Sequence, residues 1–276
     1  MRIIITAISF AGLSIAAFAA HAQKLPKVQK ASVRAPENIK VDGEATEWHG
    51  QFQAYNKATS IFYTMANDAN NIYLIVQATD QNTIKKIVQG GITLAINTSD
   101  KKEDKNNLAV TFPKYDKRNH PFYLNPDKAP KTADTLNDKM LADSLMHKYN
   151  KQLNNKLQSI GVTGIKGIPD SIISIYNEES IKAAAQFDHK IHYIFELSLP
   201  IKYVTSNQSD KAISLHYNIK LNGPMGNGST VTMIPGRNVL TFKSSDGINY
   251  SLGEATQENM DFAYPTDFWG VYTLKK

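Results

Sequence analysis

Residues 39–48 read Ile39-Lys40-Val41-Asp42-Gly43-Glu44-Ala45-Thr46-Glu47-Trp48, and this stretch is the strongest indication of the fold. Ile39 and Val41 alternate with a lysine, which predicts a short strand with one buried side. Asp-Gly is a turn-forming pair, so we expect the chain to reverse at Asp42-Gly43. Trp48 follows five residues after the glycine. The spacing predicts a turn that lays the indole on the body of a domain. We expect Trp48 to pack in the core, and a sugar-binding platform is the alternative.

Alternating apolar and polar residues predict strands along much of the remaining chain. Successive side chains of a strand point to opposite faces, so each alternation indicates one buried side. Turn-forming residues separate many of these runs. The clearest runs are 72–77, 92–96, 108–112, 191–199 and 213–221. Many such strands without alternating helices predict an all-β fold, an antiparallel β-sandwich of jelly-roll type.

One segment has helical spacing instead and predicts a single inserted α-helix over residues 134–160. Asp134 or Thr135 can cap its start, and Gly161 would end it. Its apolar residues recur every three or four positions: Leu141, Leu145, Tyr149, Leu153, Leu157 and Ile160. The helix lies in a polar insertion at about residues 98–177. We expect its apolar stripe to lie on the sandwich, and a docking helix for a partner is the alternative.

The N-terminal 22 residues have the pattern of a cleavable signal peptide. Arg2 precedes an apolar run over residues 3–19, and Ala20-His21-Ala22 is a small-x-small cleavage site before Gln23. The alternative is an uncleaved membrane anchor, and no other stretch is apolar and long enough to span a bilayer. The sequence therefore predicts a secreted or periplasmic protein with no transmembrane segment after cleavage. We expect residues 23–38 to be a linker and residues 39–276 to be a single sandwich domain.

Composition limits the chemistry of the chain. It contains no cysteine, which excludes disulfides, thiolate metal sites and a lipobox cysteine. The formal net charge is +6, and loss of Arg2 with the signal peptide lowers it to +5. Lysines are mixed with acids along the chain, which favours an ordinary solvated surface over attraction to an anionic polymer. No nucleic-acid-binding motif is present, so we expect no nucleic-acid partner.

The opening motif, Val41-Asp42-Gly43-Glu44 followed by Trp48, resembles the start of family-nine carbohydrate-binding modules and related DOMON-like β-sandwiches. Later segments resemble further strands of that family, in the same order on both sides of the insertion: 59–80, 91–97, 193–200, 215–222 and 265–274. The resemblance implies a sandwich fold and binding of a glycan or polysaccharide.

The chain departs from the family at the residues that hold the sugar. Members of the family hold a sugar chain end between two Trp side chains. The loop that would carry the first reads Lys85-Lys86-Ile87-Val88-Gln89-Gly90 and has no aromatic residue. The position of the second is Phe262, which keeps an aromatic face and lacks the indole N–H donor. The resemblance therefore implies that this chain keeps one of the two aromatic faces that hold the sugar, at Phe262.

Five aromatic residues, including Phe262, are candidate ligand contacts. Phe262 and Tyr264 have loop-type neighbours and are the preferred platforms for a stacked sugar. Trp269 lies in an apolar closing strand and is a candidate for either the core or the site. Phe122 and Tyr123 lie in the insertion among prolines and could form a replacement platform.

Polar candidates come from strands and turns. Glu196 and Asn218 lie on the non-core faces of their strands, where each is either a solvated side chain or a ligand contact. Asp68, Asn70 and Asp80 supply the hard oxygen atoms that calcium prefers. The Asp68–Asn70 segment is also a good turn sequence. Calcium is thus a possible cofactor, and we expect no other.

These patterns predict a secreted, non-catalytic module that binds a glycan or a glycan-like ligand. The alternative is a structural or protein-interaction module of the cell envelope that uses the insertion as its contact surface. No nucleophile motif and no recognisable acid–base pair indicates an enzyme, although a hydrolase site built by the insertion is a third hypothesis. Some DOMON relatives bind haem, and Met65, Met225, Met233 and Met260 are available as axial ligands.

Overall fold

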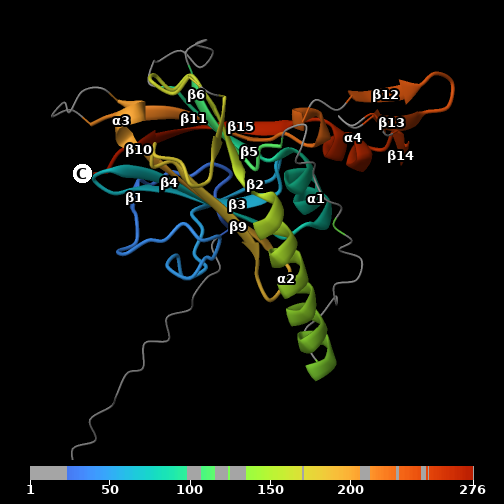
Figure 1. The fold of residues 1–276 in the computed structure, drawn as a ribbon, viewed down its shortest axis with the longest axis horizontal. Helices are drawn as coiled ribbons and strands as arrows, with labels where there is room; N and C mark the ends of the chain where they lie inside the picture. Colours follow the sequence, from blue (N-terminus) through green and yellow to red (C-terminus); the bar gives the residue numbers. More distant parts are fainter. Residues whose placement is uncertain are drawn as a thin grey trace, which may run out of the picture.

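Two six-stranded sheets form the body of the protein in the computed structural model (Figure 1). The structure describes residues 24–97, 107–115, 124, 135–169, 171–205, 212–227, 230–243, 247 and 249–275. Sheet A has the order β1-β3-β4-β10-β9, with β2 on β3: β1 (Val33–Arg34), β2 (Ala54–Asn56), β3 (Ile61–Asn67), β4 (Asn71–Ala78), β9 (Lys182–Phe187) and β10 (Tyr193–Pro200). Sheet B has the order β15-β11-β5-β6-β7-β8: β5 (Ile92–Asn97), β6 (Leu108–Phe112), β7 (Ser159–Thr163), β8 (Ile172–Ser174), β11 (Ser214–Leu221) and β15 (Thr266–Thr273). The predicted all-β sandwich is confirmed.

The main core lies between the two sheets and uses the faces that the alternation predicts. On β10 the inward residues are Tyr193, Phe195, Leu197 and Leu199, and on β11 they are Leu215, Tyr217, Ile219 and Leu221. Two buried tyrosines meet across the core, with 2.9 Å between the hydroxyls of Tyr63 and Tyr217. Each hydroxyl thereby gains a partner away from water, as buried polar groups require.

The N-terminal segment is part of the fold. Residues 24–38, which we expected to be a linker, lie on sheet A, and β1 pairs with β3 in parallel. Before β1, the buried Gln29 side chain accepts from the Met65 N–H at 2.7 Å and donates to the Met65 carbonyl at 2.8 Å. A glutamine amide carries a donor and an acceptor, so it can pair with a strand as a peptide group does. The polar composition of the segment conceals this role.

The opening motif covers the outer face of sheet A. Residues 39–41 form no strand, contrary to expectation, and β1 precedes them. The expected burial of Trp48 is confirmed, and the indole packs on this outer face with Tyr73, Ile75 and Ile194. Gly43 has φ +86°, and a Cβ there would lie 2.7 Å from the Ala185 backbone. Only glycine therefore lets the turn approach β9 so closely.

The insertion contributes both a helix and half of sheet B. The predicted helix is α2 (Leu136–Lys156), capped by Thr135, which bonds reciprocally with Asp138. Its apolar stripe packs on the sandwich as expected, with the Tyr149 ring 5.4 Å from that of Phe187. The helix ends before Gly161, which lies in β7, because residues 159–163 pair with β6 and β8. Strands β6, β7 and β8 all lie within the expected insertion.

Short helices complete the described part of the chain, where we expected one helix and find four. The others are α1 (Gln81–Gly90), α3 (Ile201–Val204) and α4 (Gln257–Ala263), with a 3₁₀ turn at Pro224–Asn227. The segment that we expected to be a loop, residues 85–90, belongs to α1. A third sheet projects beside α4 (Figure 1): β12 (Thr230–Ile234), β13 (Val239–Lys243) and β14 (Asn249–Glu254). No helix among the described residues is long and apolar enough to cross a membrane.

The end of β15 is fastened to the β3–β4 turn. Asn67 Oδ1 accepts from the Lys275 N–H at 2.8 Å and from the Tyr272 hydroxyl at 2.9 Å, and Asn67 Nδ2 donates to the Lys275 carbonyl at 2.9 Å. The Tyr272 hydroxyl also lies 2.8 Å from the Val33 carbonyl oxygen. One asparagine thus joins the first strand region, sheet A and the C-terminal strand at one end of the sandwich.

Candidate functional site

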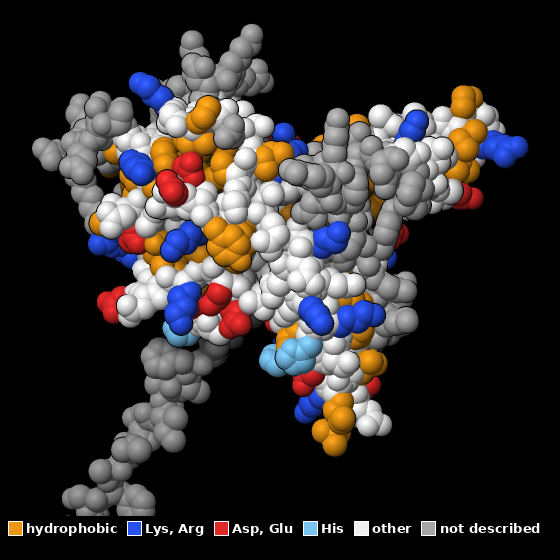
Figure 2. Space-filling view, viewed as in Figure 1, with side chains coloured by type: hydrophobic (Ala, Val, Ile, Leu, Met, Phe, Trp, Pro, Cys, Tyr) orange, Lys and Arg blue, Asp and Glu red, His pale blue; other side chains and the backbone are white. Residues whose placement is uncertain are grey.

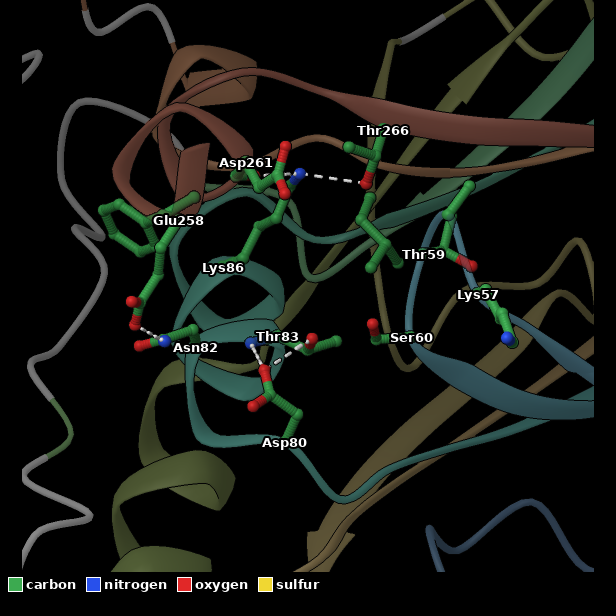
Figure 3. A pocket seen from close by; sticks show the side chains of 13 residues that line it. Lys57, Thr59, Ser60, Asp80, Asn82, Thr83, Lys86, Glu258, Asp261 and Thr266 are labelled. Atoms are coloured by element: carbon green, nitrogen blue, oxygen red, sulfur yellow. Dashed lines mark hydrogen bonds between the residues drawn. The ribbon is translucent and has the colours of Figure 1, made fainter. Parts of the chain in front are cut away.

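A cavity of about 430 Å³ opens where α1, α4 and the β2–β3 turn meet at one end of the sandwich (Figure 3). This volume lies within the usual range of small-molecule sites. We call it the end cavity. Its lining comprises Lys57, Ala58, Thr59, Ser60, Asp80, Asn82, Thr83, Lys86, Leu221, Glu258, Asp261, Phe262 and Thr266.

The wall formed by α1 is fixed by a capping residue. Asp80 Oδ1 accepts from the Thr83 N–H at 2.8 Å and from the Thr83 hydroxyl at 2.9 Å. These bonds satisfy donors at the helix start that have no partner within the helix. Asn82 donates to the Glu258 carboxylate and so connects α1 with α4 across the cavity rim. The polar wall is therefore built before any ligand arrives.

Lys86 joins α1 to α4 at the inner side of the cavity. Its Nζ donates to the Asp261 carbonyl oxygen and to the Thr266 hydroxyl, the latter at 2.9 Å. Carbonyl groups in the last turn of a helix lack intrahelical partners, and a cation there is favourable. The side chain is 4% exposed, and burial lowers the pKa of Lys86 to about 8. Lys86 thus holds α4 in place beside the cavity.

Phe262 supplies the aromatic part of the cavity. It is half-buried on α4 and lines the cavity, whereas Tyr264, at the C-terminal cap of α4, is exposed and does not line it. An aromatic face next to donors and acceptors can hold a polyhydroxylated ring, because the ring carbons pack on the π-face while the hydroxyls find partners. The end cavity has both elements.

Glu196 lies elsewhere, beneath the opening motif on the outer face of sheet A. Its Oε2 accepts from the N–H groups of Asp42 at 3.1 Å and Gly43 at 3.0 Å, and its Oε1 accepts from Trp48 Nε1 at 2.7 Å. Glu196 is 2% exposed, so it is neither a solvated charge nor a residue of the end cavity. Burial raises the pKa of Glu196 to about 7, although the three donors act in the opposite direction. Its carboxyl group holds the opening motif against sheet A.

Asn218 and Trp269 are direct partners in the register of β11 and β15. Their side chains share the outer face of sheet B, since the flanking Phe268 faces the core. Asn218 is buried and donates to the Asp267 carboxylate at 2.5 Å and the Phe268 carbonyl at 3.1 Å. Neither residue lines the end cavity. Tyr123 lies outside the described residues.

The expected calcium ligands do not come together. Asp68 and Asn70 lie in the β3–β4 turn, where Asp68 Oδ1 accepts from the N–H groups of Asn70 and Asn71, each at 2.7 Å. Asp80 lies beyond the other end of β4, roughly 25 Å away at a strand rise of about 3.3 Å per residue. The three residues therefore cannot bind one ion. In the part of the chain that the structure describes, no group of three His, Asp or Glu side chains could hold a metal.

Two residues singled out from the sequence line the end cavity: Phe262, a predicted ligand contact, and Asp80, a predicted calcium ligand. Most of the other lining residues have no sequence motif that marks them, and Lys86 lies in a segment expected to be a loop. The missed signal is a helix pattern: Asp80 precedes Thr83 at capping distance, and Ile84, Ile87 and Val88 follow at helical spacing. Glu258 and Asp261 follow a second capping residue, Thr256. Capping patterns in short segments would have located both walls.

Comparisons with known proteins identify no family. No family model matches the chain, and no curated protein matches it. A crystal structure of a "putative carbohydrate-binding protein" from Bacteroides uniformis aligns with 90% of this chain and 100% of that chain. The alignment has 9% sequence identity and a TM-score of 0.36.

Proposed function

We propose that this protein is a secreted, non-catalytic module that binds a glycan in the end cavity. One observation carries the proposal: Phe262 lies in a cavity of about 430 Å³ whose other walls are rich in hydrogen-bonding side chains. The resemblance of the opening motif to family-nine carbohydrate-binding modules supports it. Phe262 is the residue that this resemblance assigns to the second aromatic position.

The chemistry of a pyranose ring matches this lining. Its C–H face can pack on the Phe262 ring, and its hydroxyls, which both donate and accept, can bond to either kind of polar group. Lys57 and Asn82 offer donors, and Glu258 offers an acceptor. A cavity that is fixed by Asp80 and Lys86 also lowers the entropy lost on binding.

A glycan array with the folded protein, followed by calorimetry on the positive ligands, tests the proposal. We expect oligosaccharide binding that Phe262→Ala weakens and that Tyr264→Ala leaves unchanged. Tyr264 is the matched control because it lies two residues away, is aromatic and does not line the cavity. Absence of binding to every glycan by a folded protein would refute the proposal.

Secretion is the cellular part of the proposal and rests on the signal-peptide pattern of residues 1–22. Expression of the full chain should yield an extracytoplasmic protein whose N-terminal residue is Gln23. Mass spectrometry of the purified protein measures this directly. A product that retains Arg2 in the membrane fraction would instead indicate an anchor.

A second candidate function is contact with an envelope protein through α2. The start of this helix projects from the body and carries exposed apolar side chains, with Leu136 73% and Met140 63% exposed (Figure 2). Deleting residues 100–160 would be a poor test, since it removes β6 from sheet B. Because Leu136, Met140 and Leu141 are exposed, changing all three to glutamine should keep the fold. We expect the variant to lose crosslinking to the partner and to keep glycan binding. Unchanged crosslinking would refute this second function.

A further inference from the structure

The end cavity borders a buried cation, Lys86, that forms no close ion pair among the described residues. Lys86 is 4% exposed, and both of its hydrogen-bond acceptors are neutral, the Asp261 carbonyl and the Thr266 hydroxyl. Within the described residues, Lys86 forms no ion pair with a carboxylate. An ammonium has three donors, so one remains after these two bonds. Removing a charge from water is costly unless an opposite charge or hydrogen bonds compensate it.

A second ammonium lies on the other side of the same cavity. Figure 3 shows Lys57 and Lys86 on opposite walls, with the hydroxyls of Thr59 and Ser60 on the Lys57 side. Lys57 is exposed, so its side chain can move toward a ligand. Two cations and the Ser60 hydroxyl therefore line the space that one bound group could occupy.

The acidic side chains of the lining already have donors. Asp80 accepts from Thr83, Glu258 accepts from Asn82, and Asp261 accepts from Gln257 Nε2 at 2.7 Å. Two of them, Glu258 and Asp261, are exposed at the rim, where solvent screens their charge. The Asp261 carboxylate still attracts Lys86, but its effect on the pKa of Lys86 is smaller than that of burial. Lys86 is buried, so its charge acts in a medium that screens it less.

We infer that the glycan bound in the end cavity carries an anionic substituent, the carboxylate of a uronic acid or a sulfate ester, which lies between Lys86 and Lys57. The inference rests on the proposed glycan-binding function and adds the class of sugar. An anion would accept the remaining donor of Lys86 in a charge-assisted hydrogen bond, which is stronger than a bond between neutral groups. Burial lowers the pKa of Lys86 to about 8, although the charge of the Asp261 carboxylate acts in the opposite direction.

Calorimetry with matched oligosaccharides separates the effect of ligand charge on affinity from the effect of ligand shape. The probes are an oligogalacturonate, its methyl ester, a neutral oligogalactoside and a sulfated oligogalactoside, each added to the full mature protein. We expect the acid or the sulfated chain to bind at least tenfold more tightly than its uncharged counterpart. The carboxylate and sulfate probes show which anion the site takes. We expect this preference to decrease at high salt and above about pH 8, as Lys86 loses its proton.

Lys57→Gln is the principal variant, because Lys57 is exposed and its loss should leave the fold intact. It should reduce the affinity for the charged chain severalfold more than the affinity for the neutral chain, because glutamine keeps an N–H donor and loses the positive charge. Lys86→Met should abolish the preference, and a thermal melt shows whether that variant is folded. If Lys86→Met does not fold, the Lys57→Gln and pH results decide the matter.

The inference and the proposed function fail in different ways. Equal affinity for the acid and its methyl ester, and for the sulfated and neutral chains, would overturn the inference and leave glycan binding standing. A charge preference that persists in folded variants of both lysines would also overturn it. No binding of any probe or array glycan would overturn the proposed function itself.

Discussion

Glu196 and Lys86 are both buried charged residues, 2% and 4% exposed, and their surroundings differ. The two oxygens of Glu196 accept three N–H groups from the opening motif. Lys86 has two neutral acceptors and borders a cavity of about 430 Å³. A buried side chain whose hydrogen bonds are all made with its own chain holds that chain in place. A buried charged side chain that borders a cavity and has a hydrogen-bond donor left over can bind a ligand there.

Replacing Glu196 with alanine should have the largest effect on stability. The change leaves the N–H groups of Asp42 and Gly43 and the Trp48 indole without their acceptor. We expect a loss of about 3–5 kcal/mol in the free energy of unfolding, measured by urea denaturation. Glu196→Gln keeps one acceptor oxygen and should cost less. A loss below about 1 kcal/mol for alanine would show that the carboxylate does not hold the motif.

The stability of the wild-type protein should depend on pH through Glu196. The pKa of this group is raised from 4.5 to about 7 in the folded state, so between these values the folded protein binds more protons than the unfolded chain. Stability should therefore fall as pH rises from about 4.5 to 7, by at most about 3 kcal/mol. Denaturation of wild type and Glu196→Gln at each pH isolates the contribution. A constant difference between the two proteins over this range would contradict it.

Replacing Lys86 should change the free energy of unfolding less than replacing Glu196. The contribution of Lys86 to stability should also change with pH in the opposite direction. Its pKa is lowered to about 8, so above that pH the unfolded chain binds more protons and this group's contribution to stability should rise toward pH 10. At pH 7, Lys86→Met should cost about 1–2 kcal/mol, because the Asp261 carbonyl and Thr266 hydroxyl lose their donor. Lys57→Gln is the control and should change stability by less than about 0.5 kcal/mol. Equal losses from both variants would remove the distinction between the two lysines.

Phe262→Ala should affect binding with the smallest effect on the fold. Loss of one stacking ring should weaken glycan affinity about tenfold, which corresponds to about 1.4 kcal/mol. Because Phe262 is half-buried at the cavity, we expect little change in the melting temperature. Calorimetry and thermal denaturation of the same preparation measure both. A large drop in melting temperature without loss of affinity would make Phe262 a structural residue.

The alternation of apolar and polar residues located the strands correctly. It did not show which segments of the chain cover their outer faces. The pattern in β10 places Ile194 and Glu196 on an outer face, and they do lie there. Every residue of β10 is nevertheless buried, because residues 33–52 cover that face. Local periodicity records which side chains share a face. It cannot show that a distant segment covers the second face, so Glu196 looked accessible.

The end cavity shows that local sequence patterns are equally limited in predicting a binding site. Its walls come from two short helices, and the bond between Lys86 and Asp261 joins residues 175 positions apart. The resemblance identified Phe262 as a ligand contact. Asp80 was predicted for a different reason, as a calcium ligand. The convergence of Lys57, Lys86 and Glu258 depends on how the sheets close, which no single motif encodes.

The bonds between Asn67 and Lys275 also fix the orientation of any attachment at the C-terminal end. Strand β15 begins at Thr266 beside the end cavity and runs to Thr273 near Asn67, so the cavity and Lys275 lie at opposite poles of the sandwich (Figure 1). A protein coupled to a surface behind Lys275 would therefore present the cavity outward, at roughly 25 Å from the attachment point. Such coupling leaves the cavity free for long polymer chains, whereas coupling through Lys57 would block it.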